Sequence, residues 1–71
     1  MQYVRLKELR KVHGLSQNDI SKMLDTTRPQ YSLYETGKRN IPIELLMILA
    51  NFYNTSIDYI VGDTDQNKRH K

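Results

Sequence analysis

The chain has 71 residues, a formal net charge of +3 and no cysteine. A chain of this length forms one domain that buries roughly 60% of its unfolded surface, which leaves no room for a large ligand cavity beside the core. The lack of cysteine excludes a disulfide framework and a cysteine-based zinc site, and it permits a reducing compartment. No apolar run has the length of a signal peptide or a membrane span, so we expect a cytoplasmic binding module without a cofactor or small-molecule ligand.

The charged residues are unevenly distributed along the chain. Residues 1–40 carry eight Lys or Arg against four acids, whereas residues 41–67 carry four acids and no base. A short basic end, Lys68, Arg69 and Lys71, follows them. Such polarity orients a protein toward a polyanion, although an ordinary solvated surface would give the same counts.

The first predicted helix covers about Tyr3 to Val12. Leu6, Leu9 and Val12 recur at a spacing of three and form its inward stripe. Gly14 follows the predicted end, where a left-handed residue commonly terminates a helix.

The second helix is predicted to begin at Gln17. Ser16 is its N-cap, and Leu15 and Ile20 flank this cap as a hydrophobic staple. The residues expected to face inward are Ile20, Met23 and Leu24.

A tight turn follows, for which only Asp25 and Thr26 remain. Asp tolerates a left-handed backbone at modest cost, so a sharp bend is possible there without glycine. Two short helices joined by such a turn form a helix-turn-helix, which lays its second helix in a DNA major groove.

The third helix is predicted to run from about Arg28 to Thr36. Thr27 is its N-cap, Gln30 is expected to complete a reciprocal capping box, and Gly37 ends it. At a spacing of three, Tyr31 and Tyr34 form the expected inward stripe.

The fourth helix is the most apolar segment. Pro42 is predicted to be its first residue, because the missing N–H of proline has no intrahelical partner there. The core stripe is Leu46, Leu49, Ala50 and Tyr53, and a second apolar stripe is Leu45, Ile48 and Phe52. A last short helix is capped by Ser56 and ended by Gly62, so we expect one domain over residues 1–62 and a polar, disordered tail over residues 63–71.

A helix that is apolar nearly all round needs cover on several sides. We expect a second copy of the chain to supply part of this cover, with Ile57, Ile60 and Val61 at the interface of a homodimer. The alternative is that the fourth helix is simply central and is covered by the first and fifth helices.

Three segments together resemble one known family: LRKVHGLSQ at 9–17, TTRPQYSLYETGKR at 26–39 and PIELLMILANFYNTSIDYIVG at 42–62. The chain is similar over about residues 4–62 to the helix-turn-helix family of phage lambda-type repressors and Cro, the Xre-like bacterial regulators. The resemblance implies a compact all-α domain of five helices, in which the second helix crosses the phosphate backbone and the third reads base edges. The chain departs from the family at Ser21, Asp25 and Tyr31, where Ala, Gly and Ile or Val are usual, and a wider crossing of the two helices could result.

The resemblance also implies a pair between Arg10 and Glu35, which would tie the reading helix to the scaffold. The alternative is two unrelated surface charges, worth under about 1 kcal/mol.

Base reading and phosphate binding are separate tasks, since phosphate contacts supply most of the affinity and base contacts supply the sequence preference. The exposed side of the third helix is expected to read bases, with Arg28 donating to guanine O6 and N7 and Leu33 contacting a thymine methyl; Arg28 on a phosphate is the alternative. Gln30 could read adenine, but the capping box is expected to occupy it. The predicted base-reading residues are Thr27, Arg28, Pro29, Ser32 and Leu33.

Phosphate contacts are expected on both sides of the third helix. The start of the second helix presents backbone N–H groups and a positive dipole, and a basic loop follows the third helix. Capping by Ser16 is compatible with such a contact, and a solvated turn is the alternative for the loop. The predicted phosphate-contacting residues are Ser16, Gln17, Lys38, Arg39 and Asn40.

An enzyme is not expected. The chain has no Gly-rich phosphate loop and no Cys nucleophile, and His13 and His70 lack partners at metal-ligand spacing. We therefore expect a sequence-specific regulator of transcription that binds a double-stranded DNA operator, acting as a repressor. The alternative is an antitoxin or another protein-interaction module for which DNA binding is secondary.

Overall fold

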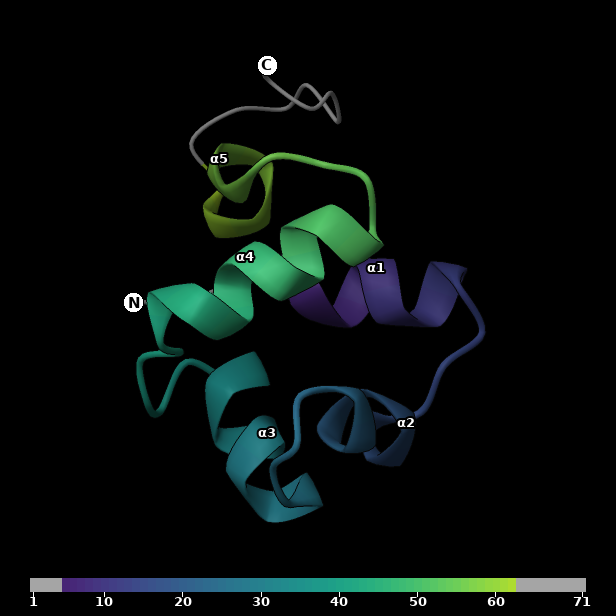
Figure 1. Cartoon of the computed structure of the whole chain (residues 1–71), viewed down its shortest axis with the longest axis vertical. Coiled ribbons are helices and arrows are strands. Elements are labelled where there is room, and N and C mark those ends of the chain that lie inside the picture. The colour runs from purple at the N-terminus through teal and green to yellow at the C-terminus, as the bar shows by residue number, and fades with distance from the viewer. Residues whose placement is uncertain (1–4, 63–71) are drawn as a thin grey trace.

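The computed structural model describes residues 5–62, which form five helices and, within that range, no strand (Figure 1). The predicted all-α architecture is confirmed. The helices are α1 (Leu6–Val12), α2 (Gln17–Met23), α3 (Arg28–Glu35), α4 (Ile43–Phe52) and α5 (Ile57–Val61). The predicted tail at residues 63–71 lies outside the described residues. The predicted start of the first helix at about Tyr3 was wrong by three positions, because Arg5 is the N-cap and α1 begins at Leu6. No helix within residues 5–62 has the length and apolarity needed to cross a membrane.

Local signals in the sequence account for the helix boundaries. The predicted N-caps Ser16, Thr27 and Ser56 each accept a hydrogen bond from the backbone N–H three residues later. Asp25 has a φ of 55°, so the turn between α2 and α3 uses the left-handed backbone expected of it. Pro42 is the N-cap of α4 rather than its first residue, a shift of one position.

In Figure 1, α4 crosses the middle of the molecule, with α5 on one side and α2 and α3 on the other. The core lies between these helices. The inward tyrosines of α3 and the core stripe of α4 are confirmed as buried. The buried apolar residues are Leu6, Leu9, Ile20, Leu24, Tyr31, Tyr34, Ile41, Leu46, Leu49, Ala50, Tyr53 and Ile60.

Two inward assignments were wrong. Val12 is 76% exposed and Met23 is 37% exposed. Three residues advance a helix by only about 300°, so a stripe built on repeated steps of three drifts away from the core. In α1 the place expected for Val12 is taken by Arg10, and in α2 the hydroxyl-bearing Ser21 is buried instead.

Ser21 is one of the departures from the family pattern, and the fold accommodates it. Its side chain is buried, and its hydroxyl donates a hydrogen bond of 2.8 Å to the carbonyl of Asn18. The polar atom is therefore satisfied within its own helix.

The expected dimer residues also need correction. Ile60 is completely buried, because it lies on the inner side of α5, where the N–H of Arg5 donates to its carbonyl. It therefore cannot contact a second copy. Ile57 and Val61 are half-buried and pack against the core.

The second apolar stripe of α4 is uncovered in the single chain. Ile48 and Phe52 are each 45% exposed, and Leu45 is half-buried. The ring of Phe52 contacts the rings of Tyr53 at 5.1 Å and His13 at 6.1 Å, and it remains partly exposed. Within the single chain, cover of this stripe by α1 and α5 is therefore incomplete at Ile48 and Phe52.

Candidate nucleic-acid interface

The outward face of α3 is built by its capped first turn. Thr27, Arg28 and Pro29 are exposed, and Ser32 and Leu33, one turn further along the same face, are half-buried. Pro29 removes no helical hydrogen bond, because the first N–H groups of a helix have no intrahelical acceptor. The first turn contains no acidic residue. All five predicted base-reading residues therefore belong to one face without a carboxylate.

Gln30 does not complete the capping box that the sequence suggested. Its backbone N–H donates to Thr27 Oγ1 at 3.3 Å, but its side-chain amide turns away from the cap. The amide nitrogen donates to the Tyr34 hydroxyl at 2.9 Å, and the amide oxygen accepts from Arg39 Nη1 at 3.0 Å. The prediction was wrong because two side-chain partners on the flank of α3 compete with the Thr27 backbone.

A reciprocal capping box occurs instead at the start of α2. Ser16 Oγ accepts from the Asp19 N–H at 3.0 Å, and the Asp19 carboxylate accepts from the Ser16 N–H at 2.9 Å. The Ser16 backbone N–H, followed by the Ser16 hydroxyl, lowers the pKa of the Asp19 carboxyl, which is therefore ionised at neutral pH. The signal was present in the sequence as a Ser followed three residues later by an acid.

This capping box bears on the predicted phosphate contacts of α2. The backbone N–H of Ser16 is taken by a carboxylate, and a negative charge now stands where a phosphate would approach. The Gln17 amide donates to Glu35 at 3.4 Å. Both predicted residues are thus engaged inside the domain.

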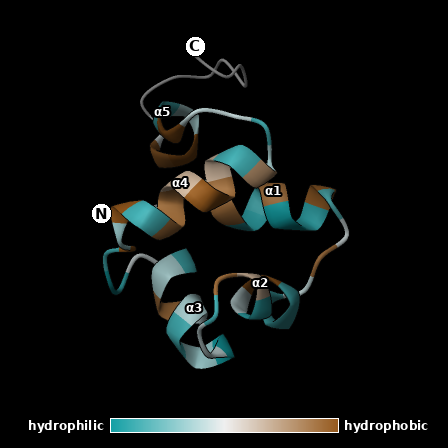
Figure 2. Cartoon of the chain, in the orientation of Figure 1, coloured by the Kyte–Doolittle hydropathy of each residue, from teal (hydrophilic) through white to brown (hydrophobic). Residues whose placement is uncertain are grey.

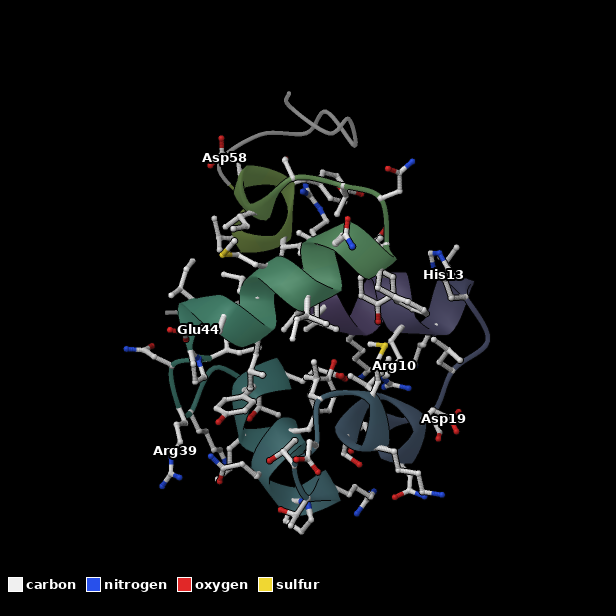
Figure 3. The ribbon with its side chains drawn as sticks, viewed as in Figure 1. Arg10, His13, Asp19, Arg39, Glu44 and Asp58 are labelled. Atoms are coloured by element: carbon white, nitrogen blue, oxygen red, sulfur yellow. The ribbon has the colours of Figure 1, made fainter. Side chains whose placement is uncertain are left out.

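The loop after α3 presents Lys38, Arg39 and Asn40, which are all exposed. Its backbone is tied to the helix, since the N–H of Arg39 donates to the carbonyl of Leu33 at 3.2 Å. Figure 3 shows Arg39 and Asp19 on opposite sides of the α2–α3 pair. The loop is therefore the strongly basic flank of α3, whereas the start of α2 is capped by an acid.

Arg10 of α1 and Glu35 of α3 form a bidentate ion pair. Arg10 Nε and Nη2 donate to the two Glu35 oxygens, both at 3.0 Å, and Arg10 Nη1 donates to the Leu15 carbonyl at 2.9 Å. Only 11% of the Arg10 side chain and 4% of the Glu35 side chain is exposed. The pair therefore fixes α3 against α1 in a largely dry environment.

The electrostatics around this pair follow from its burial. Burial pushes the pKa of Glu35 upward, but the hydrogen bonds and charge of Arg10 outweigh it, so the pKa lies below its usual range. Burial raises the pKa of the Tyr31 hydroxyl, and the neighbouring Glu35 carboxylate raises it further. Burial likewise raises the pKa of Tyr53 to about 12. At neutral pH the pair is charged and both phenols are protonated.

Comparisons with known proteins agree with this geometry. A family profile described as helix-turn-helix matches residues 6–60. The chain is 38% identical over 61 residues to the HTH-type transcriptional regulator YobD of Bacillus subtilis, covering 86% of this chain and 54% of YobD. It is 33% identical over 67 residues to the HTH-type transcriptional regulator ImmR of the same species, covering 94% of this chain and 53% of ImmR.

A third relative has a different name. The chain is 34% identical over 58 residues to the antitoxin PezA of Streptococcus pneumoniae, covering 82% of this chain and 37% of PezA. The chain spans about half the length of the first curated relatives it matches. No solved structure matches it. On the family profile and these relatives, the chain belongs to the lambda-repressor-like, Xre-type helix-turn-helix family.

Proposed function

We propose that this chain binds a duplex DNA operator sequence-specifically and represses transcription by occupying it. The observation that carries the proposal is the outward face of α3, which combines exposed Arg28 and Thr27 with no acid in the first turn. A helix of this kind, held by a buried ion pair against its scaffold, presents base-reading groups in a fixed orientation. The relatives named as transcriptional regulators support the same function.

Base reading is assigned to the face of α3. The planar guanidinium of Arg28 can donate two hydrogen bonds to guanine O6 and N7, with a phosphate contact as the alternative. The hydroxyls of Thr27 and Ser32 can pair with several bases, and Leu33 can contact a thymine methyl. Pro29 adds apolar contact area without a donor.

Phosphate binding is assigned first to the loop of Lys38, Arg39 and Asn40. Two cations at the end of the reading helix can hold the backbone beside it. Ser16 and Gln17 are the second phosphate site. Their contribution to phosphate binding is reduced by the charge of the Asp19 carboxylate and by the hydrogen bond from Gln17 to Glu35.

We also propose a homodimer, because one short reading helix discriminates few base pairs and a two-fold pair reads two half-sites. The second copy is assigned to the exposed apolar side of α4 and the adjoining part of α5. A groove of about 790 Å³ lies between these helices, and its apolar lining is Met47, Ile48, Ala50 and Ile57. The proposed dimer surface therefore consists of Met47, Ile48, Ile57 and Val61. Ile60 is left out of it because Ile60 is buried.

The test is selection of bound sites from random duplex DNA. The expected result is a two-fold symmetric sequence with half-site centres about 34 Å apart, or a multiple of that spacing. Enrichment of no sequence would refute sequence-specific binding. A single asymmetric site bound by one copy would refute the dimer and leave base reading intact.

A protein-interaction role is the second candidate, and the similarity to the antitoxin PezA favours it. The two roles differ in partner stoichiometry. Affinity purification that recovers one tight, stoichiometric protein partner, together with weak selection of DNA, would support the antitoxin role over the repressor.

A further inference from the structure

The side chain of Gln30 is held in a network on the flank of α3. Its amide nitrogen donates to the hydroxyl of Tyr34, one turn later, at 2.9 Å. Its amide oxygen accepts from Arg39 Nη1 at 3.0 Å. Tyr34 is buried and belongs to the core, so one end of the amide is anchored to a rigid part of the domain.

This network leaves the amide one orientation. Arg39 can only donate, so the Gln30 oxygen must face it, and the nitrogen must then face Tyr34. A primary amide has two donor hydrogens and two acceptor lone pairs. Each partner takes one, so Gln30 retains one donor and one acceptor of fixed polarity.

One donor beside one acceptor is complementary to the major-groove edge of adenine. Adenine offers the N7 acceptor and the N6 donor, whereas guanine offers two acceptors, N7 and O6. An amide that cannot flip would turn its oxygen toward guanine O6, which is repulsive. Gln30 is the third residue of α3, within the first turn that enters the groove in a helix-turn-helix.

We propose that Gln30 is an additional base-reading residue that selects adenine, with Tyr34 and Arg39 as positioning residues that fix its amide. The inference rests on the proposed function, because it requires α3 to lie in the major groove. Arg39 then has two tasks: its charge favours phosphate, and its Nη1 group orients Gln30. Lys38, the neighbouring cation, can only attract phosphate.

The test uses the sites selected by the wild-type chain, with 7-deazaadenine replacing one adenine at a time to remove N7. The wild-type chain is expected to lose about tenfold or more in affinity at one adenine per half-site, as for a bidentate amide contact. At that position Gln30→Ala should bind adenine, 7-deazaadenine and guanine with similar affinity. Circular dichroism and thermal unfolding check that each variant is folded.

The positioning roles have separate readouts. Tyr34→Phe removes only the hydroxyl and should reduce the preference for adenine over guanine without changing the salt dependence of binding. Arg39→Ala should reduce both the preference for adenine and the salt dependence of binding. The matched control Lys38→Ala should reduce the salt dependence alone.

The outcomes distinguish this inference from the function on which it rests. If Gln30→Ala keeps the wild-type preference at every adenine while the wild-type chain still selects a site, Gln30 does not read a base and the proposed function stands. If the wild-type chain selects no duplex site, both proposals fail. If Arg39→Ala and Lys38→Ala behave alike, Arg39 has no positioning role.

Discussion

The α2–α3 region and the α4–α5 region expose opposite kinds of surface. Residues 5–40, which include α1, contain eight Lys or Arg and four acids, whereas residues 41–62 contain the acids Glu44 and Asp58 and no base. Figure 2 shows hydrophilic colours over most of α2 and α3 and hydrophobic colours along α4 and α5. An excess of basic side chains suits a polyanion, and exposed aliphatic side chains suit another protein surface. The difference supports a division of tasks, with DNA at one end and a second copy at the other.

The two regions differ also in how they are held in place. α3 is attached to α1 by a buried ion pair, Arg10 with Glu35. α5 is attached to the start of α1 by Arg5, whose guanidinium donates to the Tyr59 carbonyl at 2.8 Å and lies 4.2 Å from the Tyr59 ring centre. α3 is therefore tied to α1 by a dry charge pair in addition to its buried tyrosines, and this charge pair can be removed by one substitution.

The largest effect is expected from Glu35→Gln. The substitution keeps the shape but removes the charge, which leaves the buried Arg10 guanidinium without its counter-ion. Loss of one partner of a buried pair costs about 3 to 5 kcal/mol in the free energy of unfolding. The control is Glu8→Gln, since the Glu8 side chain is 61% exposed, lies 3.8 Å from Arg5, and its loss should cost under about 1 kcal/mol. Urea unfolding of both variants measures the loss in the free energy of unfolding. Equal small losses would show that the Arg10–Glu35 pair contributes no more to stability than the Arg5–Glu8 pair.

The same pair predicts a pH dependence. The pKa of Glu35 lies below its ordinary value of 4.5, so its contribution to stability is fully present above that pH and is lost as the pH falls through the lower folded-state pKa. The difference in unfolding free energy between the wild type and Glu35→Gln should therefore shrink below about pH 4.5. Urea unfolding at several acidic pH values checks this. A difference that stays constant down to pH 2 would assign the loss to packing instead of charge.

The next largest effect is expected at the dimer surface. Ile48→Glu places a charge in the exposed apolar stripe of α4 and should raise the dimer dissociation constant by about tenfold or more, since a buried isoleucine contributes roughly 1.5 to 3 kcal/mol. Val12→Glu is the matched control, because Val12 is an exposed aliphatic residue of α1 outside the proposed interface. Sedimentation equilibrium from micromolar to millimolar concentration measures both. A wild-type chain that stays monomeric throughout would contradict the proposal.

A smaller and more local effect is expected from Arg28→Ala. If Arg28 reads a guanine, the variant should lose about 1 to 3 kcal/mol on the selected site and relax the preference at one position per half-site. Binding to random duplex DNA should change little. An equal loss on every sequence would reassign Arg28 to a phosphate. Competition binding on single-base variants of the site separates the two results.

Much of the fold could be predicted because the signals that carry it are local. Caps and left-handed glycines depend on residues within one turn, so the ends of α2 to α5 followed from the sequence to within about one position. The start of α1 has no side-chain cap, and the sequence placed it three residues too early. The exposure of Val12 could not be predicted by spacing alone, since Arg10 takes its place in the core by pairing with another helix. Ile60 was wrongly assigned to the dimer surface. A helix of five residues such as α5 is held to the domain by burying an apolar side chain, and Ile60 is the residue that α5 buries.

The candidate site was predictable in part. The outward face of α3, to which base reading is assigned in the proposal, followed from the positions of its two buried tyrosines. The partner of Glu35 came only from the family resemblance, because 25 residues separate it from Arg10. The side-chain network of Gln30 was missed, since its partner Arg39 lies nine residues away, beyond the reach of a capping pattern.

The smallest effect is expected on the salt dependence of DNA binding. It tests whether the position of the basic residues after α3, and not only the net charge of the chain, determines binding. Changing Lys38 and Arg39 together to Ala should weaken binding to specific and random DNA, and the slope of log affinity against log salt should fall by up to about 0.9 for each lost phosphate contact. Lys7→Ala combined with Lys11→Ala removes the same charge from exposed positions of α1. If net charge alone attracted the DNA, both double variants would change the slope equally. If the loop after α3 holds the backbone, only the first will, and fluorescence anisotropy titrations at several salt concentrations distinguish the two.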